Sequence, residues 1–436
     1  MQSEWSSNRV KRHPYPSYRD SGVEWLGEIP AHWEVVRLKK IANVMFSSVD
    51  KHSFEDEESV FLCNYVDVYK NDIITSELGF MKATASKEEI KKFTLKRDDV
   101  LITKDSESWN DIAIAAYVPE NLCNVVCGYH LALVRPKTKQ IDGRFLFYSF
   151  HSRPINYQFE VEATGITRYG IDQYAIGSGL FVLPPLPEQR AIADFLDRET
   201  ARIDALIARY QRLMELLEEK RASLISQAVT RGLDASVAMK DSGVEWLGEV
   251  PTHWNLVKLK HIAQLKSGES INSDDMHSEG YFPVYGGNGL RGYTNAYTHD
   301  GRFILIGRQG ALCGNINYAE GKFWASEHAV VVTPVRPLIT IWLGELLRAI
   351  NLNQFSISAA QPGISVERIN QLIIPFPPIS EQKDIARLLD SETARIALIK
   401  EEIVSMIDKL KEYRTALISA AVTGKMDVRA GGSHAV

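Results

Sequence analysis

A long block of sequence occurs twice in this chain, and this repeat limits the folds that the chain can adopt. The first shared block begins at Asp20-Ser21-Gly22-Val23-Glu24-Trp25 and returns 221 residues later at Asp241. A closing block, Pro-Pro-Leu-Pro-Glu-Gln at 184–189, returns as Pro-Pro-Ile-Ser-Glu-Gln at 377–382. The stretch between the blocks is 28 residues shorter in the second copy. Shared ends around unlike middles indicate one frame that carries two different domains.

The stretches between the shared blocks combine strand and helix patterns. In the first copy, short apolar runs predict strands at 60–62, 100–102 and 130–134, and a helix at 145–151. The second copy repeats the order with strands at 303–306 and 329–332 and a helix at 342–350. The predicted fold class is therefore α+β, with two tandem α/β domains.

A long helix is predicted after each closing block. It runs about 40 residues, from near Glu188 or Glu381 to near Thr230 or Thr423, which is on the order of 60 Å. Its apolar residues recur at steps of three and four: Ile203, Leu206, Tyr210, Leu213 and Leu217 in the first helix, and Ile396, Ile399, Ile403, Met406, Leu410, Tyr413 and Leu417 in the second. The charged residues between them leave a narrow apolar strip. This favours pairing of the helices as an antiparallel coiled coil with pseudo-twofold symmetry over packing of each on its own domain.

These patterns divide the chain into six segments. The N-terminal stretch is polar and lacks periodicity, so it is predicted to lie on the surface as an arm. The predicted segments are the arm 1–19, a first domain 20–186, a first helix 187–232, a second domain 233–379, a second helix 380–425 and a tail 426–436.

Composition restricts the class of protein. A formal net charge of −5 gives no general support for nucleic-acid binding, because phosphate affinity comes from clustered Lys and Arg. No run of about 18 apolar residues and no apolar leader occurs, which predicts a cytoplasmic protein without membrane spans. Cys123 and Cys127 with His130 could begin a zinc site, but the second copy has no matching pair. We expect buried reduced thiols and no metal.

A glycine-rich segment in the second copy matches the dinucleotide-binding pattern at Gly287, Gly289 and Gly292. That fingerprint requires a helix after the glycines, and residues 293–298 have no helical pattern. Two interpretations remain open. The segment is a turn between strands, or a loop whose backbone approaches a DNA groove closely, with Asn288 and Arg291 at base edges or phosphates.

Two further pairs of segments are candidates for contact with DNA. Arg308 and Gln309 follow an apolar strand, and these residue types form bidentate hydrogen bonds with guanine and adenine. The counterpart of Gly307-Arg308-Gln309-Gly310 in the first copy is taken as Lys104-Asp105-Ser106-Glu107. Segments 165–170 and 360–363 lie at matching places before the closing blocks, and they add Arg168, Tyr169 and Gln361.

Motifs for catalysis are missing from the sequence. It contains no Gly-x-x-x-x-Gly-Lys-Ser/Thr phosphate loop, no Asn-Pro-Pro-aromatic or Asp-Pro-Pro-aromatic tetrapeptide, no His-Glu-x-x-His and no nucleophile elbow. The sequence therefore predicts a chain that is not an enzyme. The alternatives are an enzyme that holds a nucleotide at the glycine-rich loop, and a scaffold that binds proteins and not DNA.

The doubled Ser-Gly-Val-Glu-Trp-Leu-Gly-Glu-x-Pro-x-His-Trp block, the two closing blocks and the two long helices cover nearly the whole chain. In these features the chain resembles the specificity (S) subunits of bacterial and archaeal type I restriction-modification enzymes. The resemblance implies two target recognition domains, each reading one half of a split, asymmetric site in double-stranded DNA, with the coiled coil holding them apart.

The same resemblance implies the partners. Two methyltransferase subunits and the restriction subunits would bind this chain, and they would use S-adenosylmethionine, ATP and Mg²⁺, with no cofactor in the chain itself. The complex would be a site-specific deoxyribonuclease and an adenine-N6 methyltransferase. The loops that such proteins point at DNA match 285–289 and 307–310. The candidate DNA-binding residues are Lys104, Asp105, Ser106, Arg168, Tyr169, Tyr285, Gly287, Asn288, Gly289, Arg291, Arg308, Gln309 and Gln361.

Overall fold

The computed structural model describes residues 14–310, 312–356 and 363–429. The chain forms two compact units, which divide the two long helices between them. Unit 1 contains the chain up to Arg209 together with the residues from Met406 onward, and unit 2 contains Tyr210–Ser405. Most of the predicted arm and tail, residues 1–13 and 430–436, lies outside the described residues. Within the described part of the arm, Tyr15 is buried against Trp33 and does not lie on the surface.

Domain 1, the strands and short helices of unit 1, is built on two main sheets. The first is antiparallel, in the order β4 (Ala42–Phe46), β11 (Leu131–Pro136), β7 (Val100–Thr103) and β9 (Ala115–Tyr117). The second has the order β10 (Val125–Cys127), β5 (Glu58–Cys63) and β6 (Met81–Ala85), with β10 parallel to β5. Three two-stranded pairs complete it: β1 (Tyr18–Asp20) with β2 (Glu28–Pro30), β3 (Glu34–Arg37) with β13 (Leu180–Leu183), and β8 (Asp105–Ser106) with β12 (Tyr169–Gly170).

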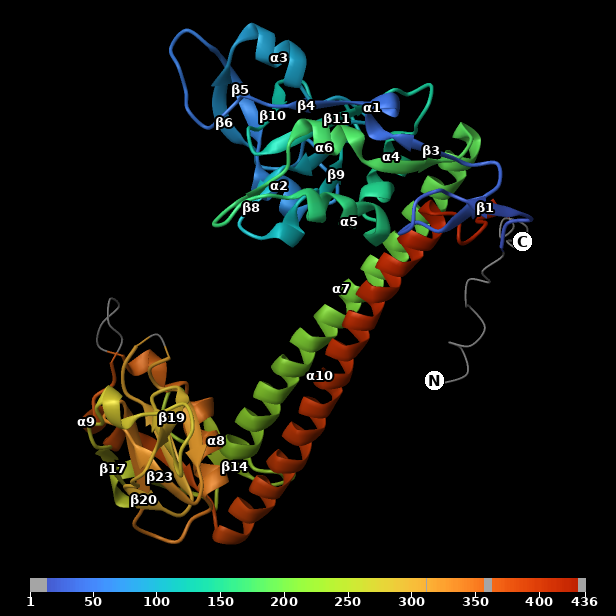
Figure 1. Ribbon diagram of the computed structural model, residues 1–436. Helices are drawn as coiled ribbons and strands as arrows, with labels where there is room; N and C mark the ends of the chain where they lie inside the picture. The colour runs from blue at the N-terminus through green and yellow to red at the C-terminus, as the bar shows by residue number, and fades with distance from the viewer. Residues whose placement is uncertain (1–13, 311, 357–362, 430–436) are drawn as a thin grey trace. The chain divides into compact units, whose positions relative to one another are not determined.

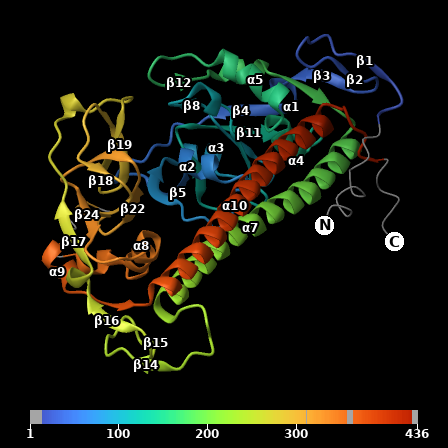
Figure 2. The same ribbon diagram turned by 90° about the horizontal axis from the view of Figure 1, so that it is seen from below.

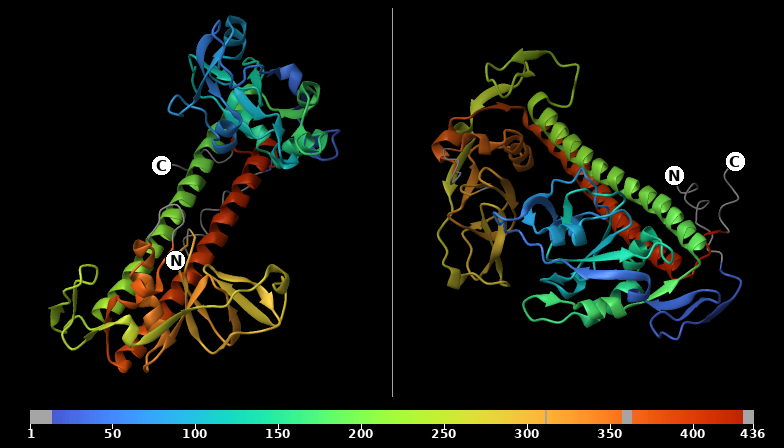
Figure 3. Two further views of the ribbon diagram at one scale, coloured as in Figure 1. Left: turned by 90° about the vertical axis from the view of Figure 1, so that its left-hand side faces the viewer. Right: turned by 90° about the horizontal axis from the view of Figure 1, so that it is seen from above.

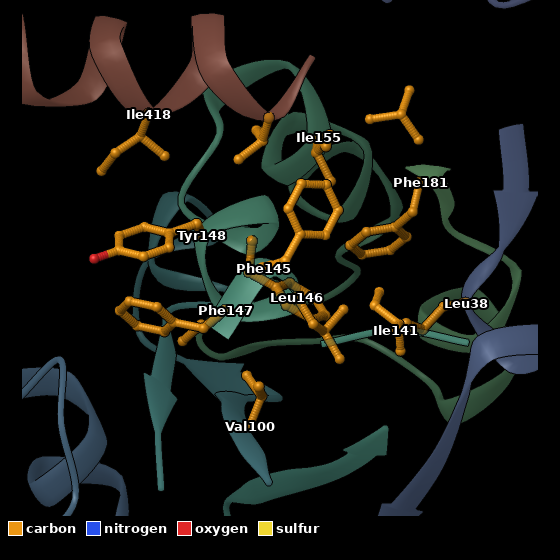
Figure 4. Packing of buried hydrophobic residues seen from close by; sticks show 14 of the residues in the cluster. Leu38, Val100, Ile141, Phe145, Leu146, Phe147, Tyr148, Ile155, Phe181 and Ile418 are labelled. Carbon is orange, nitrogen blue, oxygen red and sulfur yellow. The ribbon is translucent and has the colours of Figure 1, made fainter. Parts of the chain in front are cut away.

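Short helices connect these strands, and one of them forms the centre of the core. The helices are α1 (Leu38–Ile41), α2 (Tyr65–Lys70), α3 (Lys87–Phe93), α4 (Gly143–Phe150), α5 (Arg153–Glu162) and α6 (Gln173–Ser178). The carboxylate of Asp142 caps α4 by accepting hydrogen bonds from the first backbone N–H groups. Phe145 and Leu146 of α4 belong to one core cluster with Phe181 and with Ile418 of the second long helix (Figure 4). The end of that helix is therefore part of the core of unit 1.

Domain 2, the strands and short helices of unit 2, repeats this topology. Its antiparallel sheet has the order β17 (Ala263–Ser267), β24 (Ala329–Pro334), β21 (Phe303–Gly307) and β22 (Ile316–Ala319). Its second sheet has the order β19 (Gly289–Thr294), β18 (Phe282–Gly286), β23 (Lys322–Ala325) and β20 (His299–Asp300), with β18 parallel to β23. The pairs β14 (Met239–Asp241) with β15 (Glu249–Pro251) and β16 (Asn255–Lys258) with β25 (Ile373–Phe376) match those of domain 1. The helices are α8 (Thr340–Ala349) and α9 (Val366–Asn370). The predicted α+β class is confirmed.

The two long helices are α7 (Leu186–Arg231) and α10 (Ile379–Val422), and they run antiparallel. In unit 1 the first half of α7 lies beside the last turns of α10, where Arg414 Nε is 3.2 Å from Asp204 Oδ1 (Figure 1). In unit 2 the later part of α7 lies beside the first half of α10, and Glu218 pairs with Lys400 (Figure 3). The residue number rises along α7 and falls along α10 between these pairs. The predicted antiparallel coiled coil is therefore confirmed. Among the described helices, none is long and apolar enough to cross a membrane.

The buried strip of the helix pair differs from the predicted strip at three positions. Leu213, Met406 and Tyr413 are each about 40% exposed. Their neighbours Met214, Ile407 and Arg414 face inward in their place. The steps of three and four alternate in the opposite order over these turns, and both orders fit a helix of 3.6 residues per turn. Arg414 is tolerated in the strip because Asp72 accepts a hydrogen bond from its Nη2 and the carboxylate of Asp204 forms an ion pair with it.

In each unit the first shared block contacts the closing block of the same copy. This contact accounts for the repetition of both blocks together. In unit 1, Trp33 Nε1 donates to Glu188 Oε1 at 3.2 Å, and His32 Nε2 lies 2.9 Å from Glu188 Oε2. In unit 2, Trp254 and His253 make the same pair of contacts with Glu381, at 2.9 and 2.7 Å. The glutamate of each closing block therefore fixes the first shared block to the start of a long helix.

The glutamine of each closing block ties the helix to its domain. Gln189 is fully buried, accepts from the backbone N–H of Asp142 at 2.9 Å and donates to the carbonyls of Gln140 and Pro184. Gln382 is bonded in the same way, to the N–H of Ile339 and the carbonyl of Pro377. The side-chain amide thus pairs backbone groups that would otherwise be buried without partners.

Replacing Gln189 by alanine is expected to lower the free energy of unfolding of unit 1 by about 2–3 kcal/mol, because it leaves buried backbone groups unpaired. Chemical denaturation of the full chain, followed by tryptophan fluorescence, measures this change. The neighbouring Arg190, whose side chain is 60% exposed, is the control, and its replacement by alanine is expected to cost below about 0.5 kcal/mol. Equal stabilities of the two variants would contradict the proposed role of the amide.

Candidate nucleic-acid interface

In domain 1 the fold brings the five predicted residues together. Lys104, Asp105 and Ser106 leave the end of β7, and Asp105–Ser106 forms the short strand β8. This strand pairs with β12, so that Tyr169 is opposite Ser106 and Gly170 is opposite Asp105 (Figure 2). Arg168 directly precedes β12. Segments more than 60 residues apart in the sequence therefore meet and form one surface, although Ser106 itself is buried beneath it.

The carboxylate of Asp105 is the centre of this surface. It accepts from Arg168 Nη2 at 2.5 Å and lies 2.8 Å from His130 Nδ1 and 3.4 Å from Lys104 Nζ. The side chain of Asp105 is 16% exposed, whereas that of Arg168 is 53% exposed. The acidic residue is therefore matched by cationic partners, and it holds an exposed guanidinium in a defined position.

Aromatic side chains surround this charged cluster. The ammonium of Lys104 lies over the rings of Tyr129 and Phe46, at 4.4 and 5.1 Å from their centroids. The hydroxyl of Tyr65 lies 3.1 Å from Ser106 Oγ, and the Tyr65 ring stacks on Tyr69. Tyr69 and Tyr129 are more than 40% exposed. The sequence did not indicate these rings, because their residues belong to other segments that reach the surface only through the fold.

In domain 2 the glycine-rich segment is a hairpin turn. Gly287 and Asn288 connect β18 to β19, and Gly292 lies inside β19. A strand and not a helix follows the glycines, so the predicted absence of a dinucleotide-binding fold at this segment is confirmed. The segment is a turn between strands, and its contact with a DNA groove stays a prediction. A methyl group on Gly287 would lie 3.0 Å from the carbonyl oxygen of His328 and 3.3 Å from Gly307 Cα. This turn packs closely on the end of β21, which leaves little room for a side chain on Gly287.

The hairpin borders an open pocket of about 330 Å³. Most candidates of the second copy lie around it; the residues that line it are Gly287, Asn288, Gly289, Leu290, Arg291, Gln309, Leu312 and His328. Arg308 is exposed beside it, with Nη1 at 3.3 Å from Ser267 Oγ. Tyr285 does not line the pocket, because its ring packs edge-on against Phe323 in a small core cluster. Gln361 lies outside the described residues.

The hydrogen bonds of the two domains establish which residues correspond. The N–H of Lys104 donates to the carbonyl of His130 at 3.2 Å, and that of Arg308 donates to the carbonyl of His328 at 2.9 Å. The carbonyls of Lys104 and Arg308 in turn accept from an isoleucine N–H at 3.0 Å, from Ile171 in domain 1 and from Ile364 in domain 2. Lys104 therefore corresponds to Arg308. The predicted alignment, which matched Lys104 with Gly307, was wrong by one residue.

The same comparison shows that Asp105 of domain 1 and Gln309 of domain 2 occupy equivalent positions. Asp105 pairs with Gly170 in β12, and Gln309 forms a bridge with Gly363, the counterpart of Gly170. The alignment error has a simple cause. Thr103 and Gly307 both end the third strand of their sheet, but the apolar runs that marked these strands in the sequence do not fix their last residue.

The cysteines do not support a metal site. Cys127 is buried, directly opposite Cys63 in the β10–β5 pair, and burial raises the pKa of both thiols. Cys123 is exposed, which corrects the expectation that all four thiols are buried. Within residues 14–310, 312–356 and 363–429, no three His, Cys, Asp or Glu side chains form a group that could hold a metal ion.

Comparison with known proteins shows the family. The model of the type I restriction modification DNA specificity domain matches the chain twice, over residues 30–215 and 251–407, and the chain belongs to this family. Over 137 residues the chain is 44% identical to the specificity subunit of the type I restriction enzyme EcoprrI of Escherichia coli. This match covers 30% of the chain and 34% of that relative.

More distant relatives match along almost their whole length. The putative MjaX specificity subunit of Methanocaldococcus jannaschii is 25% identical, over 93% of this chain and 96% of the relative. A chain from a solved structure of a type I restriction-modification system shares the fold with a TM-score of 0.65 at 18% identity. That comparison covers 90% of this chain and 98% of the other. The chain is therefore similar in its entire layout to DNA specificity subunits.

Proposed function

We propose that this chain is the specificity subunit of a type I restriction-modification complex and reads a bipartite, asymmetric site in double-stranded DNA. Each domain would read one half-site with the surface at the end of β7 or β21. The observation that carries this proposal is the equivalence of these two surfaces: they occupy the same place in one repeated topology and carry different side chains. Two such surfaces suit two different short sequences.

The residue types of both surfaces suit DNA. Domain 1 offers the exposed guanidinium of Arg168 with Tyr69 and Tyr129 beside it, and domain 2 offers Arg308 with Gln309. Arginine recognises guanine and phosphate, and glutamine recognises adenine. The net charge of −5 does not by itself oppose this role, because phosphate affinity depends on where Lys and Arg lie and not on their total.

Catalysis belongs to partner chains in this proposal. Two methyltransferase subunits would bind the chain and use S-adenosylmethionine, and restriction subunits would use ATP and Mg²⁺. The chain would supply recognition and a scaffold, with no cofactor of its own, in the cytoplasm of a bacterial or archaeal cell. The complex would cleave DNA, as the names of the relatives as restriction enzyme subunits suggest, and it would also methylate adenine.

Duplex binding tests the proposal. The chain, assembled with its methyltransferase subunits, is mixed with a library of random duplexes, and bound sequences are recovered and read. We expect a two-part consensus and an affinity that falls steeply with salt, because each neutralised phosphate contributes about −0.9 to the slope of log K against log salt. Binding without sequence preference, or without salt dependence, would contradict it.

Two controls separate the alternatives. Equilibrium dialysis of the chain alone against ATP and S-adenosylmethionine is expected to give no retention, whereas retention of either would support the nucleotide-binding enzyme. Association with the methyltransferase subunits but no DNA binding by the assembly would support the protein-binding scaffold.

A further inference from the structure

Both domains build the same three-residue arrangement at the end of the third strand of the first sheet. A basic residue comes first, Lys104 or Arg308, and its N–H is bonded to the carbonyl of a histidine, His130 or His328. The side chains of these histidines are 41% and 43% exposed. The third position is Asp105 in domain 1 and Gln309 in domain 2. The basic residue and the histidine are therefore of the same type in both domains, and the residue at the third position differs.

This difference has a direct consequence if the domains read different half-sites. Residues that contact the phosphate backbone can be alike in both domains, because the backbone is common to all DNA. A residue that selects a base must differ between domains that read different sequences. At the third position the hydrogen-bonding chemistry changes from an acceptor-only carboxylate to an amide that donates and accepts. The two backbone hydrogen bonds of the basic residue are the same in both domains.

We propose that Asp105 and Gln309 occupy one equivalent specificity-determining position, which sets one base pair in each half-site. This inference rests on the proposed function and adds to it the residue in each domain that selects a base. Asp105 acts as a positioning residue for Arg168, and Gln309 acts directly.

In domain 1 the geometry favours an indirect role for Asp105. Its side chain is only 16% exposed, and one of its oxygens accepts from Arg168 Nη2 at 2.5 Å. The guanidinium of Arg168 is fixed through Nη2, and its other N–H groups are available to donate to a base edge. An arginine in a fixed orientation forms bidentate hydrogen bonds with O6 and N7 of guanine, so domain 1 is expected to prefer guanine at this position.

In domain 2 the side chain itself reaches the surface. Gln309 is exposed and lines the pocket beside Asn288 and His328. A glutamine amide pairs in bidentate fashion with N6 and N7 of adenine. Domain 2 is therefore expected to prefer adenine at the equivalent position of the other half-site.

The test measures base preference in the assembled complex with the methyltransferase subunits, by selection from duplexes in which one half-site is randomised at a time. Asp105→Asn keeps the shape of the side chain but removes the charge that holds Arg168. Its matched control is Glu107→Gln, which removes one negative charge from an exposed residue of the same loop. Gln309→Ala is paired with Gln264→Ala, an exposed glutamine on β17 of the same domain.

We expect Asp105→Asn and Gln309→Ala each to reduce discrimination at one base pair of their own half-site by roughly ten-fold or more. The other half-site, and both control variants, should keep the preferences of the unmodified complex. Melting temperatures within about 2 °C of the unmodified chain would show that the variants fold, and because Gln309 is exposed, its variant carries the test even if Asp105→Asn is unstable.

Two results would overturn the inference. One is unchanged discrimination in both variants, and the other is a loss that spreads evenly over both half-sites or appears equally in Glu107→Gln and Gln264→Ala. Failure of the proposed function has a different signature, because the unmodified complex would then select no sequence at all.

Discussion

Replacing Trp33 by alanine is expected to lower the free energy of unfolding of unit 1 by about 3–5 kcal/mol, the range for a large aromatic removed from a core. Trp33 is fully buried and donates its indole N–H to Glu188. Its ring packs against Tyr15, with 5.5 Å between ring centroids. A methyl group on Gly424 would lie 3.0 Å from Trp33 Cζ3, so the end of α10 also rests on this ring. The variant therefore removes the side chain on which four segments pack: the first shared block, the segment of Tyr15, the start of α7 and the end of α10. We call this contact region the joint.

Chemical denaturation of the full chain measures the loss, and a residue of the same shared block supplies the control. Trp25 is 37% exposed, and its replacement by alanine is expected to cost below about 1 kcal/mol. Trp254 occupies the equivalent position in unit 2 and is equally buried. Trp254→Ala is therefore expected to lower the free energy of unfolding of unit 2 by as much as Trp33→Ala lowers that of unit 1. A small effect in both buried positions would show that the joint does not stabilise the units.

Replacing Gly307 by alanine is expected to damage domain 2 and to abolish recognition of its half-site. The added methyl would lie 2.4 Å from the carbonyl oxygen of Gly287 and 2.9 Å from that of Leu312. Both neighbours are backbone atoms, so no side-chain rotation can relieve the clash. We expect a loss of at least about 1–3 kcal/mol and a displaced hairpin next to Gln309.

Duplex selection with the assembled complex distinguishes a local from a general effect of this variant. The preference for the half-site of domain 1 should persist, and that for the half-site of domain 2 should disappear. Gly363→Ala is the control, because a methyl group there would meet its nearest neighbour, the carbonyl of Arg308, at an ordinary 3.8 Å. Normal recognition of both half-sites by the Gly307 variant would refute the expectation.

The sequence predicted the parts of the fold that depend on local pattern. The strands around Val100, Leu133, Leu305 and Val331 form where the apolar runs are, and the long helices begin and end within a few residues of the expected positions. The antiparallel pairing followed from helices too long and too narrow in their apolar strip to pack alone. Exposed Met406 and Tyr413 show the limit: apolar type alone did not decide which of two neighbouring residues faces inward.

The candidate surface was predicted less completely, for physical reasons. Lys104 and Arg168 were both candidates because their segments occupy matching places in the two copies, and the strand pair β8–β12 joins these segments. The stacking of Lys104 on Tyr129, and the packing of the partly buried Tyr285 against Phe323, depend on contacts between distant segments that no local pattern encodes. The correspondence of Asp105 with Gln309 needed the backbone hydrogen bonds, because the loops around these residues share no sequence.

The division of the long helices between the units has a consequence for folding during synthesis. A nascent chain leaves the ribosome from its N-terminus, so domain 1 emerges first. The core of unit 1, however, includes Leu417, Ile418 and Met426, which are made after every residue of unit 2. Unit 2 can therefore complete its core before unit 1 does. Domain 1, although it is translated first, keeps an uncovered apolar face until the last segment of the chain has been translated.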